Sequence, residues 1–301
     1  MIFLLGPTAS GKSRLAMELA RQTGAEICSL DAFQVYRGLD IGTAKPSRMA
    51  QTEIGHHLLD LVEPEEGFTA ADYLQQATEV LKDLQKRSQR AVWVGGTGLY
   101  HKVLTEGLAK APGTDLKVAS DLEAWPTEKL AQEIRRVDPE WSEKADLQNR
   151  RRMVRALAVW QQTGRKMSSW QTEETQPGPL LGVKTYALIP DLDHLAAVIR
   201  ARVAGMIQDG WAEEVKRLRE RPGWRGCPGG RAIGYREIEL WVTGNMRKEE
   251  AGDRIVAATR AYAKRQLTWL KRVPNLEVIE AQPGQSLPAT GVEKRAKALA
   301  G

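Results

Sequence analysis

The chain has 301 residues, of which 42% are hydrophobic and 27% charged, and its formal net charge is +6. These values are typical of a globular protein with one large domain or two smaller ones. No apolar run approaches the roughly 18 residues that a membrane span needs, so we expect no membrane partner. The N-terminus has no basic start and no small-residue cleavage site, which favours a cytoplasmic protein. Two cysteines and four histidines argue against a structural zinc site, and the positive charge weakly favours a polyanionic partner.

Residues 6–13 fit the phosphate-binding loop pattern G-x-x-x-x-G-K-[ST] in full, between an apolar run at 2–5 and a helical pattern at 14–22. In that setting, backbone N–H groups and the helix N-terminus bind a phosphate or pyrophosphate. Lys12 adds a positive charge, and the Ser13 hydroxyl can ligate Mg²⁺. The pattern does not distinguish a nucleotide from a prenyl pyrophosphate. The predicted pyrophosphate-binding residues are Gly6, Thr8, Ala9, Ser10, Gly11, Lys12 and Ser13.

Strand and helix patterns alternate over the first ~105 residues, as a parallel α/β sheet requires. Thr69 is a suitable N-cap for a long helix, and Asp72 completes a capping box with it. The elements expected here are strands at 2–5, 27–30, 57–62 and 91–94, helices at 14–22 and from 69 onward, and a turn at 95–98.

After residue 108 the pattern becomes helical, without a convincing strand, and Pro/Gly-bearing segments lie at both ends of this stretch. A strand at 182–189, helices at 192–221 (with breaks) and 248–271, and a strand at 276–279 follow. We therefore predict an α/β fold with a P-loop NTPase-like core and a parallel sheet. The predicted domains are the core at 1–107 and 182–290, a helical insertion at 108–181, and a loose tail at 291–301.

Two polar side chains follow expected strands, at the sheet edge where parallel α/β proteins bind ligands. Asp31 could act as a general base, as an indirect Mg²⁺ ligand or only as a capping carboxylate. Thr97 lies among three glycines, which indicates either close approach of the backbone to a ligand or an ordinary tight turn.

A basic segment lies within the expected insertion, with four arginines among residues 150–155. On a helix, Arg151 and Arg155 fall on one face with Arg152 beside them. Such a stripe can grip a sugar–phosphate backbone, and a solvated charged face would have the same pattern.

Taken together, these motifs strongly resemble those of the bacterial tRNA dimethylallyltransferases (tRNA isopentenyltransferases). The likeness spans residues 2 to 272, and its stretch at 34–46 is highly specific. The segments that carry it are 6–13, 31–46, 55–60, 95–100, 152–157, 232–237 and 264–269.

The resemblance implies a defined reaction. Such an enzyme transfers a dimethylallyl group from dimethylallyl pyrophosphate to the exocyclic amine of the adenine 3′-adjacent to the tRNA anticodon, and releases pyrophosphate. It implies Mg²⁺ as the cofactor, a helical insertion that clamps the anticodon stem-loop, and we expect a monomer.

The resemblance also assigns roles to residues. By position, Asp31 matches the general base, Thr97 the hydroxyl at the scissile bond, and Arg202 an arginine that reaches the pyrophosphate. Apart from the resemblance, Phe33, Tyr36 and Tyr100 could each be a stacking surface for a base or a core residue. The family usually has serine where this chain has Ala32. The residues that the resemblance assigns to tRNA contact are Asp31, Ala32, Phe33, Gln34, Thr97, Arg151, Arg152, Met153, Val154 and Arg155.

Three alternatives remain at this point. A small-molecule kinase would explain the phosphate loop and Asp31, but neither the stretch at 34–46 nor the basic insertion. An adenylate prenyltransferase would share the core but needs no clamp for a free nucleotide. A non-catalytic RNA-binding P-loop protein would have no need of Lys12, Asp31, Thr97 and Arg202 together.

Overall fold

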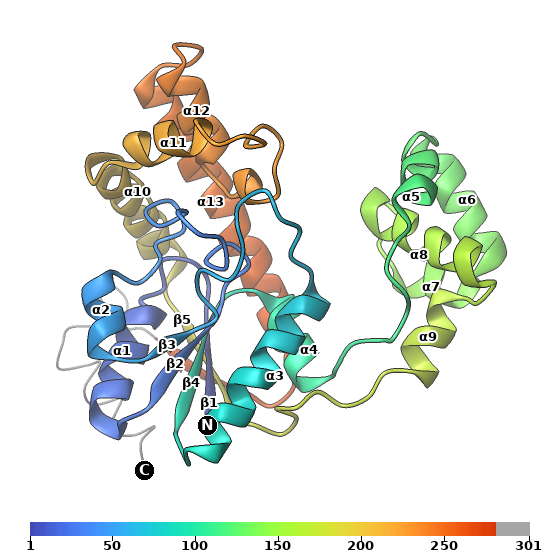
Figure 1. Cartoon of the computed structure of the whole chain (residues 1–301), viewed down its shortest axis with the longest axis horizontal. Helices are drawn as coiled ribbons and strands as arrows, with labels where there is room; N and C mark the ends of the chain where they lie inside the picture. Colours follow the sequence, from blue (N-terminus) through green and yellow to red (C-terminus); the bar gives the residue numbers. More distant parts are fainter. Residues whose placement is uncertain (281–301) are drawn as a thin grey trace. The chain divides into compact units, whose positions relative to one another are not determined.

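A computed structural model describes residues 1–280 of the chain, with the backbone alone at residues 192, 193 and 280. The chain folds into two compact units (Figure 1). One unit comprises Met1–His101 and the described residues from Gly182 onward, and the other comprises Lys102–Leu181. The expected tail at 291–301 lies outside the described residues, as do residues 281–290 of the expected core. Within residues 1–280, no helix is long and apolar enough to cross a membrane.

The first unit is built on a six-stranded sheet in the order β3-β2-β4-β1-β5-β6, and every neighbouring pair is parallel. This confirms the predicted α/β class. Because all strands run the same way, the segments that follow β1, β2 and β4 emerge at the same edge. The strands are β1 (Ile2–Leu5), β2 (Glu26–Leu30), β3 (His56–His57), β4 (Ala91–Gly95), β5 (Thr185–Ile189) and β6 (Leu276–Glu280).

The strand expected at 57–62 is mostly wrong. Only His56–His57 pairs with β2, and the chain then leaves the sheet, because Leu58 and Asp60 adopt φ angles of 64° and 52°. These left-handed conformations are incompatible with an extended strand. Val62 returns only as an isolated bridge to Tyr36.

The helices of this unit largely follow the apolar patterns. The Thr69–Asp72 capping box at the start of α3 is present as predicted. The helix expected over 192–221 is interrupted where Gly210 has a φ of 99°. Helices α2, α4 and α12 were not predicted. The helices are α1 (Lys12–Thr23), α2 (Arg48–Glu53), α3 (Ala70–Lys86), α4 (Gly98–Thr105, which crosses into the other unit), α10 (Leu192–Gln208), α11 (Trp211–Arg219), α12 (Tyr235–Val242) and α13 (Lys248–Leu270), with a 3₁₀ turn at Gly229–Arg231.

Two apolar clusters hold this unit together. One packs α1 against the sheet, around Leu4, Leu15 and Val92. The other joins the segment after β2 to the C-terminal helices, with Val35 and Leu39 fully buried in it. In Figure 1, α10, α11 and α12 gather beyond the carboxyl ends of the strands. The segment after β2 is therefore fixed by helices that lie far from it in sequence.

The second unit consists of helices that enclose their own core. Buried Asp138 accepts hydrogen bonds from the backbone N–H groups of Trp141 and Ser168 and from the Ser168 hydroxyl, and so joins α7 to α9. Among residues 102–181, β structure is limited to the Ala109–Thr175 bridge, as the pattern predicted. The helices are α5 (Leu116–Glu123), α6 (Thr127–Val137), α7 (Pro139–Lys144), α8 (Arg150–Thr163) and α9 (Met167–Glu173).

Candidate active site

The phosphate loop lies between β1 and α1. Ala9 and Gly11 have φ angles of 63° and 85°, which turn successive backbone N–H groups toward one side. Gly6 is tightly enclosed: a Cβ there would lie 2.7 Å from the Leu188 carbonyl oxygen and 2.8 Å from Ser10 Oγ. Ser10 Oγ is buried and finds no hydrogen-bond partner among residues 1–280. An orphaned hydroxyl in such a loop is suited to an anion that accepts its proton.

Lys12, Arg202 and Asp31 form the charged part of the site. Burial, and to a lesser extent the nearby Arg202, lower the pKa of Lys12 to about 8, against an opposing effect of Asp31. Burial also lowers the pKa of Arg202, and Asp31 opposes that shift. The Lys12 ammonium donates to the Pro7 carbonyl at 3.1 Å, whereas Arg202 has no hydrogen bond or ion pair with any described residue. Two cations therefore face one carboxylate.

Asp31 directly follows β2 and has two distinguishable oxygens. Its Oδ1 accepts hydrogen bonds from the backbone N–H groups of Phe33 (2.9 Å) and Gln34 (3.3 Å). This is the capping role considered for the residue. Its Oδ2 makes no hydrogen bond within residues 1–280. Asp31 can therefore cap the turn with Oδ1 while Oδ2 stays available to accept a proton.

Thr97 is held beside the Asp31 turn. Its Oγ1 accepts a hydrogen bond from Ala32 N at 3.2 Å, and its own N–H donates to the Leu30 carbonyl at 3.1 Å. Burial and Asp31 raise the pKa of Tyr262, on α13, to about 12, and hydrogen bonding of Tyr262 to Thr97 partly offsets this shift. Tyr262 was not among the predicted site residues, because its position in sequence carries no sign of this contact.

The glycines around Thr97 have a different cause from the expected ligand approach. A Cβ at Gly95 would collide with the Leu30 carbonyl, and a Cβ at Gly98 would lie 2.5 Å from Trp269. The protein's own packing therefore requires these glycines.

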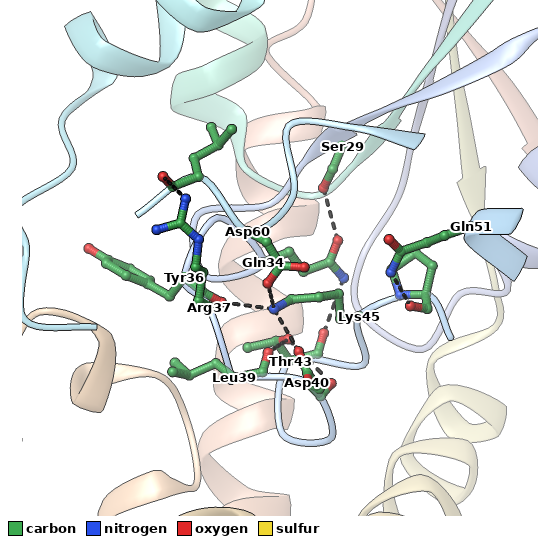
Figure 2. Close-up of polar contacts among 12 residues, drawn as sticks. Ser29, Gln34, Tyr36, Arg37, Leu39, Asp40, Thr43, Lys45, Gln51 and Asp60 are labelled. Atoms are coloured by element: carbon green, nitrogen blue, oxygen red, sulfur yellow. Dashed lines mark hydrogen bonds and ion pairs between the residues drawn. The ribbon is translucent and has the colours of Figure 1, made fainter. Parts of the chain in front are cut away.

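The side-chain amide of Gln34 is hydrogen-bonded to other groups of the protein. Its Oε1 accepts from Ser29 Oγ at 2.9 Å, and its Nε2 donates to the Thr43 carbonyl at 3.2 Å (Figure 2). The same Nε2 also donates to the Ala44 carbonyl at 3.2 Å. The side chain thus ties β2 to the far end of its own loop. This accounts for a Gln in the specific stretch at 34–46, and the tRNA contact expected of Gln34 stays a prediction.

Lys45 is the centre of the same stretch. Its side chain is 2% exposed, and its ammonium donates to Asp60 Oδ1 at 2.6 Å, Asp40 Oδ1 at 2.7 Å and the Tyr36 carbonyl at 2.8 Å (Figure 2). Three acceptors satisfy the three N–H groups of the buried cation. The contact also places Asp60, whose left-handed backbone ended the expected strand.

A cavity of about 640 Å³ lies between this stretch and α10. Among the predicted site residues, only Arg202 lines it. The lining residues are Asp40, Ile41, Ala44, Lys45, Pro46, Ser47, Arg48, Gln51, Asp60, Arg202, Gly205, Met206 and Asp209.

Comparison with known proteins decides the family. The family model described as IPP transferase matches residues 34–273. The chain belongs to the IPP transferase family. It is 40% identical over 280 residues to tRNA dimethylallyltransferase 1 of Citrifermentans bemidjiense, which covers 93% of this chain and 92% of that protein. It is 38% identical over 284 residues to the tRNA dimethylallyltransferase of Geobacter sulfurreducens, with 93% and 91% covered.

Solved structures agree with this assignment. The tRNA isopentenylpyrophosphate transferase of Bacillus halodurans matches with a TM-score of 0.71 at 30% identity, over 99% of this chain and 95% of that one. A eukaryotic dimethylallyltransferase acting on tRNA matches with a TM-score of 0.83 at 25% identity, over 99% of this chain and 77% of that one. The P-loop-like core and the enzyme class predicted from sequence are therefore confirmed.

In this IPP transferase the side chains expected to touch RNA on α8 divide into two groups. Arg151 and Arg152 are exposed. Met153 and Val154 are 0% and 5% exposed, inside the core of the helical unit, so the structure contradicts an RNA contact by these two side chains. Both residues lie on the apolar face of the helix. The resemblance assigned the whole segment to tRNA contact without distinguishing the two faces.

Arg155 also departs from the expected surface stripe. It is half-buried, and its guanidinium donates to Thr114 Oγ1 at 2.8 Å and to the Ala111 carbonyl at 3.3 Å. Burial lowers its pKa. Arg155 thus fixes the segment before α5, and the RNA contact expected of the exposed Arg151 and Arg152 stays a prediction.

Two of the three aromatic residues considered for base stacking are buried as well. Tyr100 is buried and stacks on Tyr73, with ring centroids 3.6 Å apart, and Tyr36 is also buried. Phe33 alone of the three aromatic residues is partly exposed.

The donor set for a metal is small. Among the described residues, no group of three or more His, Cys, Asp or Glu side chains could hold an ion. Ser13 is exposed at the start of α1, and Asp31 lies near enough to Lys12 to shift its pKa. Mg²⁺ usually binds through few protein oxygens together with substrate phosphates, so these residues fit an ion that is held jointly with a pyrophosphate.

Proposed function

We propose that this chain transfers a dimethylallyl group from dimethylallyl pyrophosphate to the exocyclic amine of the adenine 3′-adjacent to the anticodon in tRNA, releasing pyrophosphate. One observation carries the proposal: a phosphate loop, two partly buried cations and a carboxylate with a free oxygen meet at the edge where β1, β2 and β4 end. The names of the relatives agree with tRNA as the acceptor. The expected monomeric state and cytoplasmic location stay predictions.

The two cations and the loop amides act on the leaving group. As the allylic C–O bond breaks, its electron pair goes to pyrophosphate, whose negative charge grows. Lys12 and Arg202 are partly buried, and burial lowers the pKa of both, so their charges act on that growth with less screening by water than exposed cations would. Ser10 Oγ and the N–H groups of Ala9 and Gly11 are the further donors we assign to this anion, whereas the Thr8 N–H is already engaged by Gln266. Mg²⁺, which Ser13 would hold, would neutralise part of the same charge.

Asp31 acts on the nucleophile. The adenine amine forms the new N–C bond and must lose a proton, which we assign to Asp31 Oδ2. Such proton transfer is typically worth ~10²–10⁴-fold in rate. Thr97 Oγ1 already accepts from Ala32 N, so its hydroxyl proton can be donated to the bridging oxygen of the pyrophosphate.

The proposal is tested by incubating the protein with unmodified tRNA, Mg²⁺ and radiolabelled dimethylallyl pyrophosphate, with free AMP as a parallel acceptor. Label is expected in tRNA and not in AMP. Label in AMP alone would instead identify an adenylate prenyltransferase. Binding of ATP without any transfer of label would favour a kinase. Asp31→Asn is the matched variant, since the amide oxygen can still accept from Phe33 N, and we expect it to bind tRNA while losing transfer.

A further inference from the structure

A side chain of the C-terminal helix joins the two loops of the active site. Gln266, on α13, is 3% exposed. Its Oε1 accepts a hydrogen bond from Thr8 N in the phosphate loop at 2.8 Å, and its Nε2 donates to the Gly96 carbonyl at 3.0 Å. Gly96 directly precedes Thr97. One amide therefore spans the pyrophosphate-binding loop and the turn that carries the Thr97 hydroxyl.

The Gln266 amide packs closely against the turn before Thr97. A Cβ at Gly96 would collide with Gln266 Nε2 and would lie 3.0 Å from the Gly6 carbonyl oxygen. One turn further along α13, Trp269 occupies the space where a Cβ of Gly98 would be. The two loops and the helix are thus in direct contact, at the segment 264–269, which is one of those that carry the resemblance.

The chemistry of the contact requires glutamine. Thr8 N is a donor and Gly96 O is an acceptor, so the bridging group must offer one acceptor and one donor at the same reach. Glutamate lacks the donor, and methionine has the same length but offers no N–H. A buried polar group that loses its hydrogen-bond partner lowers the stability of the folded protein. Moving the two loops apart would break these hydrogen bonds, so the bridge holds the loops at a fixed distance.

We propose that Gln266 is a positioning residue for the transfer reaction, which fixes the Thr97 turn relative to the phosphate loop by bonding Thr8 and Gly96. The inference rests on the proposed prenyl transfer. The phosphate loop holds the leaving group, while Thr97 and the neighbouring Asp31 turn serve the scissile bond and the amine. The Gln266 amide is buried and bonded to protein atoms, so we assign it no contact with either substrate. A misplacement of about 1 Å between such groups costs roughly 10²-fold in rate.

Three variants separate this role from general stability. Gln266→Met removes the hydrogen bonds to Thr8 and Gly96 at constant length, and Gln266→Glu keeps the acceptor for Thr8 N and removes the donor for Gly96 O. Gln89→Met is the matched control, because Gln89 Nε2 donates to the Gly24 carbonyl and Gln89 precedes β4, at the opposite end of that strand from Gly96. The measurements are the single-turnover rate at saturating substrates, the Kd of inorganic pyrophosphate and the melting temperature.

For Gln266→Met we expect the single-turnover rate to fall roughly 10²-fold, with the pyrophosphate Kd within about threefold of wild type. Gln89→Met should keep both values, even if its melting temperature falls. Gln266→Glu should recover toward the wild-type rate as the pH is lowered, because the introduced carboxyl regains a donor when it is protonated. A purely structural role would not produce that pH dependence.

Two results would overturn the inference. A folded Gln266→Met protein with a wild-type rate would remove the bridge from the reaction, and a loss of pyrophosphate affinity in proportion to the rate would make Gln266 part of the binding site. If Gln266→Met does not fold, the pH profile of Gln266→Glu decides. If the wild-type protein transfers no label, the proposed function fails. Hydrogen exchange at Thr8 N still tests the bridge, because this amide should be protected in wild type and exchange faster in Gln266→Met. Equal protection in the two proteins would contradict the bridge.

Discussion

The loop that lines the cavity depends on one buried carboxylate, Glu214, which is 2% exposed on α11. Its Oε2 accepts from the backbone N–H groups of Asp40 (3.0 Å) and Ile41 (2.7 Å), and its Oε1 accepts from Gly42 N (3.4 Å) and the Tyr235 hydroxyl (2.7 Å). Sequence reasoning missed Glu214, since a glutamate in the first turn of a helix is ordinary. We expect Glu214→Ala to be one of the most destabilising single substitutions in the chain.

The expected magnitude follows from these contacts. Tyr235→Phe removes one hydrogen bond to a charged group, which costs about 2 kcal/mol. Glu214→Ala leaves the backbone donors of Asp40 and Ile41 without their acceptor, at ~1–3 kcal/mol each, and also leaves the buried Tyr235 hydroxyl unpaired. We therefore expect a loss of about 4 kcal/mol, compared with the ~5–15 kcal/mol of total stability that is usual for a domain.

Urea unfolding, followed by tryptophan fluorescence, measures this loss. Glu213→Ala is the control, because Glu213 is exposed and, within residues 1–280, its one ion pair is with Lys216 at 3.5 Å. It should change the free energy of unfolding by less than about 0.5 kcal/mol. A loss below about 1 kcal/mol in Glu214→Ala, at an unchanged m-value, would show that the carboxylate does not anchor the loop.

Three further predictions concern charge. Because the pKa of Lys12 is lowered to about 8, the Kd of inorganic pyrophosphate should rise as the pH goes from 7 to 9, and Lys12→Arg should flatten that rise; an equally steep rise in the variant would assign it to another group. Arg87 and His57 lower the pKa of Glu26 from 4.5 to about 2, so the stabilisation from Glu26 is present above pH 4.5 and is lost as the pH falls toward 2. Glu26→Gln should reduce the acid sensitivity of unfolding over that window, and parallel curves for the two proteins would contradict the assignment. Arg152→Ala should weaken tRNA binding and lower the slope of log K against log salt by about 1, whereas Met153→Ala should leave the slope unchanged and lower the melting temperature; the reverse pattern would contradict the division of α8.

The sequence predicts those parts of the site that depend on local geometry. The phosphate loop is encoded by its glycines and by the strand and helix on either side. Asp31 follows from the end of a short apolar run, and its capping bond to Phe33 N lies only two residues away. In both cases the residues that determine the structure are close together in the chain.

Other parts depend on distant residues, which no local pattern contains. The strand expected at 57–62 ends early where Asp60 pairs with Lys45 and its N–H donates to the Gln34 carbonyl. The sequence leaves two interpretations of the glycine turn at Thr97 open, ligand approach and an ordinary tight turn, because the neighbour of Gly96, Gln266, lies 170 residues away. Local reasoning identifies such a glycine as special, and only the tertiary structure shows what fills the space.

The most direct test of the central claim uses two synthetic anticodon stem-loops. One has adenine 3′-adjacent to the anticodon, and the other has inosine there, which lacks the exocyclic amine. With radiolabelled dimethylallyl pyrophosphate and Mg²⁺, we predict label at that adenine alone and one pyrophosphate released for each group transferred. Equal labelling of the two stem-loops, or label elsewhere in the RNA, would contradict attack by the adenine amine at this site.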